Sequence, residues 1–154
     1  MGKIIPFEAL CEGWGVKIEG KYQGAGNVLA VEVSVRPPEP GDIIIGVVEG
    51  VDRHKNSLRV CGREFFLNDE IKIKDLGHGH TTLNALESED VVKLKGRYSP
   101  ENGFVAETVN KEKKLSFAIE KMKGKIEKID RNTKTFLVNG ITVSINEDTW
   151  IEGD

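Results

Sequence analysis

The stretch KGKIEKIDRNTKTFLVNGITVSINEDTWI, from Lys123 to Ile151, decides the fold of this chain. Its short apolar runs are separated by polar turns, which predicts three strands in a meander. The second strand ends at Asn139-Gly140, a dipeptide suited to the positive φ angles of a two-residue type I′ hairpin. This segment is therefore expected to be β-structure throughout.

A second version of the meander runs from Ile45 to Ile73, without gaps and 78 residues earlier. The hairpin-like stretch from Ala9 to Val33 likewise matches Ala85 to Val109 at an offset of 76 residues. The matches include Gly46 with Gly124, Asp52 with Asp130, Gly62 with Gly140, Leu10 with Leu86, Gly20 with Gly96 and Tyr22 with Tyr98. The chain order is thus hairpin, meander, hairpin, meander, which predicts an internal duplication.

Length and composition indicate a globular protein with two small units. The chain has 154 residues, of which 38% are apolar and 31% charged, and a formal net charge of −3. That charge gives no electrostatic reason to expect nucleic acid as a partner of the whole protein. The longest apolar run, Ile43 to Val48, is too short to span a membrane, and we expect no signal peptide in this chain. Cys11 and Cys61 are expected to be free thiols.

Each copy contains five expected strands, with a glycine where the first strand of the meander would coil. The predicted fold class is therefore all-β, with two five-stranded small barrels similar to the oligonucleotide and oligosaccharide binding fold. We expect residues 43–110 to form a central complete copy. Residues 1–36 together with 122–154 would form a second, permuted copy. Residues 111–121 are predicted to be a linker helix, because Leu115, Ala118, Ile119 and Met122 have helical spacing.

These motifs resemble the bacterial domain-of-unknown-function family 5666. The residues that carry the resemblance are Gly124, Ile126, Ile129, Asp130, Gly140, Thr149 and Ile151 of the meander, with Leu86, Val92, Leu94, Gly96, Ala106 and Val109 of the hairpin. The resemblance implies barrel-like modules, often in tandem and usually in exported bacterial proteins, and supplies no catalytic residues. This chain departs from it in that we expect no signal peptide here, and in carrying Ile71 where the other copy has Thr149.

In that family the meander precedes the hairpin, whereas this chain begins with a hairpin and ends with a meander. The outer copy would then be closed by the two chain ends, either within one chain or swapped between two chains in a homodimer. Two consecutive barrels, each in hairpin-then-meander order, are the alternative.

Four residues are candidates for ligand binding. Trp14 and Trp150 lie near the expected junction of the chain ends, where aromatic rings can stack on bases or sugars. The alternative is that both rings fill the seam between the ends. Lys123 and Lys125 belong to the stretch from Lys111 to Lys134, which has nine basic and four acidic residues. A solvated basic surface is the other interpretation of that stretch. Tyr22 and Tyr98 recur in both copies, which favours a shared packing role.

His78 and His80 could bind a metal ion through their imidazole nitrogens, with Asp75 and His54 as further ligands. A solvated loop is the alternative, because two ligands fall short of a zinc site. No spaced nucleophile and base, phosphate-binding loop or carboxylate pair indicates catalysis.

The sequence thus favours a non-enzymatic bacterial binding or assembly module without a cofactor, whose partner is an unknown protein or glycan. A single-stranded nucleic acid binder and a metal-binding protein at the His78 to His80 loop are the two alternatives. An extracytoplasmic location is suggested only by the family resemblance.

Overall fold

The computed structural model describes residues 2–68, 71, 73–75, 79–81, 83, 86–113 and 120–153. The prediction of an all-β protein is confirmed, because strands dominate the described chain and Phe7–Ala9 form only a short 3-10 helix, η1. No helix among these residues is long and apolar enough to cross a membrane. The strands are β1 (Lys3–Ile4), β2 (Gly15–Tyr22), β3 (Asn27–Arg36), β4 (Asp42–Asp52), β5 (Ser57–Val60), β6 (Arg63–Phe66), β7 (Ile73–Asp75), β8 (Gly79–Thr81), β9 (Val91–Ser99), β10 (Gly103–Glu112), β11 (Glu120–Lys125), β12 (Glu127–Asp130), β13 (Thr135–Val138), β14 (Ile141–Ser144) and β15 (Trp150–Gly153).

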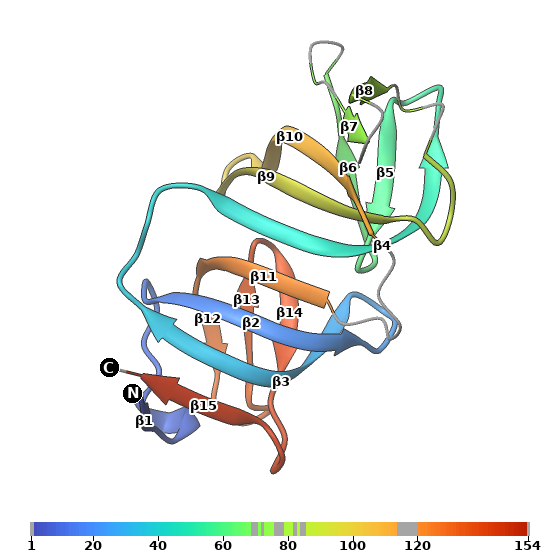
Figure 1. Ribbon diagram of the computed structural model, residues 1–154. Helices are drawn as coiled ribbons and strands as arrows, with labels where there is room; N and C mark the ends of the chain where they lie inside the picture. The colour runs from blue at the N-terminus through green and yellow to red at the C-terminus, as the bar shows by residue number, and fades with distance from the viewer. Residues whose placement is uncertain are drawn as a thin grey trace.

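The strands gather in two lobes (Figure 1). The central lobe contains β4 to β10, paired in the order β4-β9-β10-β7-β8, with β5 between β4 and β6. The outer lobe contains β1 to β3 and β11 to β15, paired in the order β12-β13-β14-β3-β2-β11, with β15 beside β3. Closure of either lobe into a five-stranded barrel stays a prediction, because the pairings form one open sheet.

Both ends of the chain contribute to the outer lobe. The last strand, β15, pairs antiparallel with β1 and parallel with β3, so the two termini lie side by side (Figure 1). The central lobe repeats this arrangement, because β7 pairs antiparallel with β8 and parallel with β10. In register, Ile151 lies opposite Val33 in the outer lobe, and Ile73 lies opposite Val109 in the central lobe.

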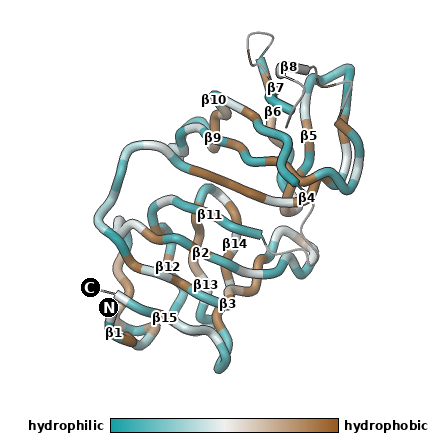
Figure 2. The backbone as a smooth tube through the Cα atoms, in the orientation of Figure 1, coloured by the Kyte–Doolittle hydropathy of each residue, from teal (hydrophilic) through white to brown (hydrophobic). Residues whose placement is uncertain are grey.

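The lobes are joined by antiparallel pairing of β11 with β4. Met122 lies opposite Ile44, and both side chains are buried. The flanking pairs are Lys121 with Ile45 and Lys123 with Ile43. Apolar residues run along β4, where this joint forms (Figure 2).

The predicted linker helix over residues 111–121 is wrong at both of its ends. Lys111 and Glu112 close β10, and Glu120 and Lys121 open β11. Residues 114–119 lie outside the described part of the chain. Met122 is therefore a strand residue of the sheet. Its spacing from Ala118 and Ile119 predicted a helix, but its pairing with distant strands decides its conformation.

The expected turn chemistry is present in both meanders. Asn139 and Gly140 have φ angles of 55° and 79°, and Cys61 and Gly62 have 51° and 73°. These paired positive values fit the type I′ hairpin that joins two strands directly. The expected bulge lies opposite Gly20, because the register shifts between Glu19 and Gly20 of β2 and the extra residue, Val31, belongs to β3.

Candidate functional site

Trp14 stands at the entrance to β2, fixed by its backbone. Gly13, with φ of 89°, donates from its N–H to the Ile126 carbonyl oxygen at 2.8 Å. The Ile126 N–H in turn donates to the Trp14 carbonyl oxygen at 2.9 Å. Main-chain bonds thus hold Trp14 against the end of β11, while its side chain stays 37% exposed.

The Trp14 side chain lines a groove of about 400 Å³ between the chain ends and the proline linker. This "chain-end groove" is lined by Ile5, Ala9, Trp14, Val35, Arg36, Pro37, Pro38 and Gly153. Arg36 is the one charged side chain among these lining residues. The apolar lining and the Trp14 ring suit an apolar group of a ligand, and the Arg36 cation at the margin suits a negative charge next to that group.

Lys123 and Lys125 lie on β11, on the other side of the same linker. The Lys123 ammonium forms an ion pair with Glu39, with 2.9 Å between Nζ and Oε2. The hydrogen bond from Lys123 lowers the pKa of the Glu39 carboxyl, helped by the lysine charge. The Lys125 side chain has no hydrogen bond or ion pair with the residues that the structure describes, whereas its backbone pairs with Gly15 in the sheet. Both lysines line a small pocket that shares Arg36, Pro37 and Pro38 with the chain-end groove.

Trp150 is separate from this group. The residue is 51% exposed, its Nε1 donates to Glu152 Oε2 at 3.3 Å, and it is not among the residues lining the groove. The structure therefore brings Trp14, Lys123 and Lys125 around the linker and leaves Trp150 on the outer surface of β15.

A second hollow, the "interlobe cleft", opens where the linker enters β4. It measures about 250 Å³ and is lined by Glu39, Pro40, Gly41, Asp42, Arg97, Tyr98, Lys125, Glu127 and Asn139. Asn139 is only 4% exposed, and its Nδ2 donates to the carbonyl oxygens of Ile43 and Lys123. Because Ile43 and Lys123 belong to different lobes, this side chain fixes the floor of the cleft.

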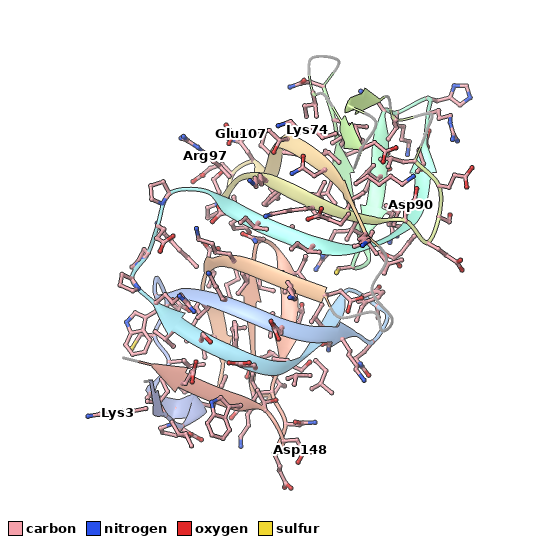
Figure 3. The ribbon with its side chains drawn as sticks, in the orientation of Figure 1. Lys3, Lys74, Asp90, Arg97, Glu107 and Asp148 are labelled. Carbon is pink, nitrogen blue, oxygen red and sulfur yellow. The ribbon has the colours of Figure 1, made fainter. Side chains whose placement is uncertain are left out.

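Tyr98 forms one wall of the interlobe cleft. Its N–H donates to Asp42 Oδ2 at 2.7 Å, which places the ring beside the linker. Burial raises the pKa of the Tyr98 phenol, and the nearby Glu127 carboxylate adds to the rise. The hydroxyl therefore keeps its proton at neutral pH and can both donate and accept hydrogen bonds. Arg97, the preceding residue, projects toward Glu107 on β10, with 4.0 Å between Nε and Oε1 (Figure 3).

The opposite side of the interlobe joint carries two buried groups, Cys61 and Glu120. Burial, reinforced by the charges of Glu120 and Glu49, raises the pKa of the Cys61 thiol to about 12. Burial also raises the pKa of the Glu120 carboxyl, although the hydrogen bond from the Tyr22 N–H opposes this at 2.9 Å. A buried thiol held in its protonated form is a poor nucleophile, so this side offers no reactive cysteine.

The structure does not assemble a metal site in the part of the chain that it describes. His78 lies outside the described residues, and only the backbone of His80 is described, in β8. The other two suggested ligands are Asp75, on β7, and His54, whose backbone N–H donates to Asp52. No group of three His, Cys, Asp or Glu side chains is placed to hold a metal ion among the described residues.

Sequence reasoning missed the interlobe cleft. Tyr98 was assigned a packing role because Tyr22 matches it, and Arg97, Glu127 and Asn139 were not singled out for binding. The only available signal was Lys125, which lies on the edge of the cleft. The cleft depends on the pairing of β4 with β11, which no local sequence pattern predicts.

Comparison with protein families identifies a domain family over most of the chain. Residues 45–110 and 123–154 match the model of a domain of unknown function, DUF5666. No curated protein and no solved structure matches the chain.

Proposed function

The chain belongs to the DUF5666 family, and from that premise we propose that it is a non-enzymatic binding or assembly module for a protein partner. The observation that supports this function is the chain-end groove beside Trp14. Its volume of about 400 Å³ falls within the range of pockets that take a small ligand or a protruding side chain. A half-exposed tryptophan beside two prolines is also the kind of aromatic anchor on which protein interfaces depend.

The lining of the groove defines the chemistry of the partner. Apolar contacts from Ile5, Trp14 and Val35 favour an aromatic or aliphatic side chain, and Arg36 favours a carboxylate beside it. The partner is therefore a polypeptide segment in which a large apolar residue has an acidic neighbour.

Selection from a displayed library of random linear peptides on the full-length protein tests this proposal. We expect enriched peptides to share an aromatic or aliphatic residue next to Asp or Glu. Binding of a synthetic peptide of that class should be lost in Trp14→Ala and weakened in Arg36→Gln.

Trp150→Ala is the matched control, because that tryptophan is exposed and lies away from the groove. Enrichment of no common motif, or equal loss of peptide binding in Trp14→Ala and Trp150→Ala, would overturn the proposal.

Single-stranded nucleic acid binding is a second candidate, supported by the position of Trp14 near Lys123 and Lys125. Three lysines of the basic stretch nevertheless have carboxylate partners: Lys111 with Asp90, Lys121 with Glu19 and Lys123 with Glu39. Such pairs reduce the positive charge available to phosphates. Tryptophan quenching by oligonucleotides that saturates at low salt and fades at high salt would favour this candidate instead.

Two further proposals stand on the sequence alone. Metal binding at His78 and His80 is tested by equilibrium dialysis against zinc, nickel and copper, and no retained metal would remove it. A homodimer that swaps the chain-end strands is tested by size-exclusion chromatography with light scattering. A measured mass equal to that of the monomer would rule out the homodimer.

A further inference from the structure

The joint between the lobes has an internal two-fold relationship. Ile44 and Met122 occupy matching positions of the two meanders and lie opposite each other in the antiparallel pairing. The carboxylates that begin β4 and β11 also match, since Asp42 accepts from the Tyr98 N–H and Glu120 accepts from the Tyr22 N–H. Each side of the joint can therefore be compared with the other, residue by residue.

We call one side of the joint the closed side, because its polar groups are hydrogen-bonded within the described residues. The Tyr22 hydroxyl accepts a hydrogen bond from the Gly26 N–H at 3.1 Å. Gly62 packs so tightly that a Cβ there would lie 2.5 Å from that hydroxyl. The Gly62 N–H donates to Glu49 Oε1 at 2.6 Å. The tyrosine, the glutamate and the glycine of this side are all engaged within the chain.

The other side has the same groups, but it is open. The match of Gly26 is Asn102, whose N–H donates to Ser99 Oγ at 3.2 Å rather than to Tyr98. Glu127 matches Glu49, but its carboxylate receives no hydrogen bond from the residues that the structure describes, and neither does the Tyr98 hydroxyl. Lys125 stands where the closed side has Val47, which adds a cation. The result is the interlobe cleft of about 250 Å³.

We propose that the interlobe cleft binds an acidic saccharide unit, a ligand that carries one carboxylate and several hydroxyl groups. Lys125 would bind the carboxylate, and Arg97, which lines the cleft and is paired with Glu107 on β10, would add a second cation at the margin. Glu127, Asp42 and the Tyr98 hydroxyl would accept and donate hydrogen bonds to the ligand hydroxyls. Asn139, fixed to both lobes, sets the spacing between these groups.

The mixture of groups decides between ligand classes. A simple anion would leave the carboxylates of Glu127 and Asp42 facing it without compensation, which disfavours binding. A neutral sugar would leave the cation of Lys125 without an anionic partner. Glu39, the third carboxylate of the lining, is already paired with Lys123. A ligand with both a carboxylate and hydroxyls therefore gives Lys125 an anion and gives Glu127, Asp42 and the Tyr98 hydroxyl hydrogen-bond partners, and a single sugar ring suits the volume of the cleft. This site is separate from the chain-end groove and does not depend on the partner proposed for it.

Titration of the isotopically labelled full-length protein with glucuronate, followed by amide chemical shifts, tests the proposal. We expect saturable shifts centred on Tyr98, Lys125 and Asn139. Glucose and acetate should each bind about tenfold more weakly, because each lacks one of the two recognised features. A short polyuronate tested in parallel distinguishes the two sources of the ligand: tighter binding than glucuronate indicates a unit within a glycan, and equal binding a free sugar acid.

Lys125→Val, which installs the residue of the closed side, should weaken glucuronate binding about tenfold. Lys21→Ala is the matched control, because Lys21 is the counterpart of Arg97 on the closed side and should leave binding unchanged. No saturable shift, equal binding of acetate and glucuronate, or equal affinity of Lys125→Val and the parent protein would overturn the proposal. Lys125 is exposed, so its replacement leaves the fold intact, and a thermal unfolding curve verifies this.

Discussion

The Asn139 side chain on the outer lobe donates a hydrogen bond to the carbonyl oxygen of Ile43 on the central lobe, with 3.2 Å between Nδ2 and the oxygen. A second bond from the same Nδ2 reaches the Lys123 carbonyl oxygen at 3.1 Å. Asn139 therefore has two roles, since it also adopts the positive φ angle of the type I′ turn.

Replacing Asn139 with alanine should destabilise the protein by about 2 to 3 kcal/mol. The change leaves two backbone carbonyls without their donor and places an alanine in the left-handed region. Urea unfolding measures the effect. Asn102→Ala, at an exposed turn, should change stability little, and equal unfolding midpoints for both variants would contradict the assigned role of Asn139.

Gly96→Ala should destabilise the protein by about 3 kcal/mol or more, because the new Cβ would meet backbone rather than a movable side chain. It would lie 2.0 Å from the Val105 carbonyl oxygen, and the bulge between β9 and β10 leaves no room for a shift. Gly50→Ala is the control, since no atom lies within 4 Å of a Cβ built there. Thermal unfolding of both variants checks the prediction, and a stable Gly96→Ala protein would refute it.

Features of this fold that depend on neighbouring residues could be predicted from the sequence, whereas features that depend on pairing between distant strands could not. The positive φ angles of Asn139 and Gly140 could be predicted, because asparagine and glycine are the residues that most readily adopt them. The bulge at Gly20 could be predicted as well, because a glycine inside a strand often marks a bulge. The joint of β4 with β11 could not be predicted, because Met122 fits the spacing of either a helix or a strand. Pairing with Ile18 and Ile44, both far away in the chain, decides between them.

The same limit applies to the candidate sites. Trp14 could be singled out from the sequence, because it lies near the expected junction of the chain ends, where an aromatic ring can stack on a ligand or fill the seam. Tyr98 could not, since its match with Tyr22 indicates equal roles. The difference between the two hydroxyls arises from a neighbouring turn, where the Asn102 N–H bonds to Ser99 instead of to the tyrosine.

Glu120→Gln should stabilise the protein at neutral pH. Burial raises the pKa of the folded Glu120 carboxyl above its ordinary value of 4.5, so the folded state binds the proton more tightly than the unfolded state. The resulting stabilisation is complete below about pH 4.5 and is lost as the pH rises through the folded pKa. Glutamine is neutral at every pH and still accepts from the Tyr22 N–H.

The free energy of unfolding, measured in urea across this pH range, should therefore favour Glu120→Gln at pH 7 and show no advantage in acid. The exposed Glu101→Gln serves as the control. An advantage of Glu120→Gln that is the same at all pH values would show that the carboxyl charge is not its cause.

The two cysteines should differ in reactivity. Cys11 is exposed, whereas Cys61 is buried and its thiol pKa is raised to about 12, which leaves almost no thiolate at pH 8. Iodoacetamide should therefore add once to the folded protein, at Cys11, and twice after denaturation. Mass spectrometry of the digested protein locates the adducts, and rapid labelling of Cys61 in the folded state would contradict the described packing.

Cutting the chain within the proline linker should leave the two pieces associated. The N-terminal strand pair, β2 and β3, is bonded to β11, β14 and β15 from the far end of the chain. These contacts bury Ile18, Val28 and Val33, so separation would expose much of the outer core to water. A protease site inserted between Pro38 and Glu39 provides the cut. The cleaved protein should elute as one species under native conditions and as two in denaturant, whereas native separation of the pieces would show that the linker holds the outer lobe together.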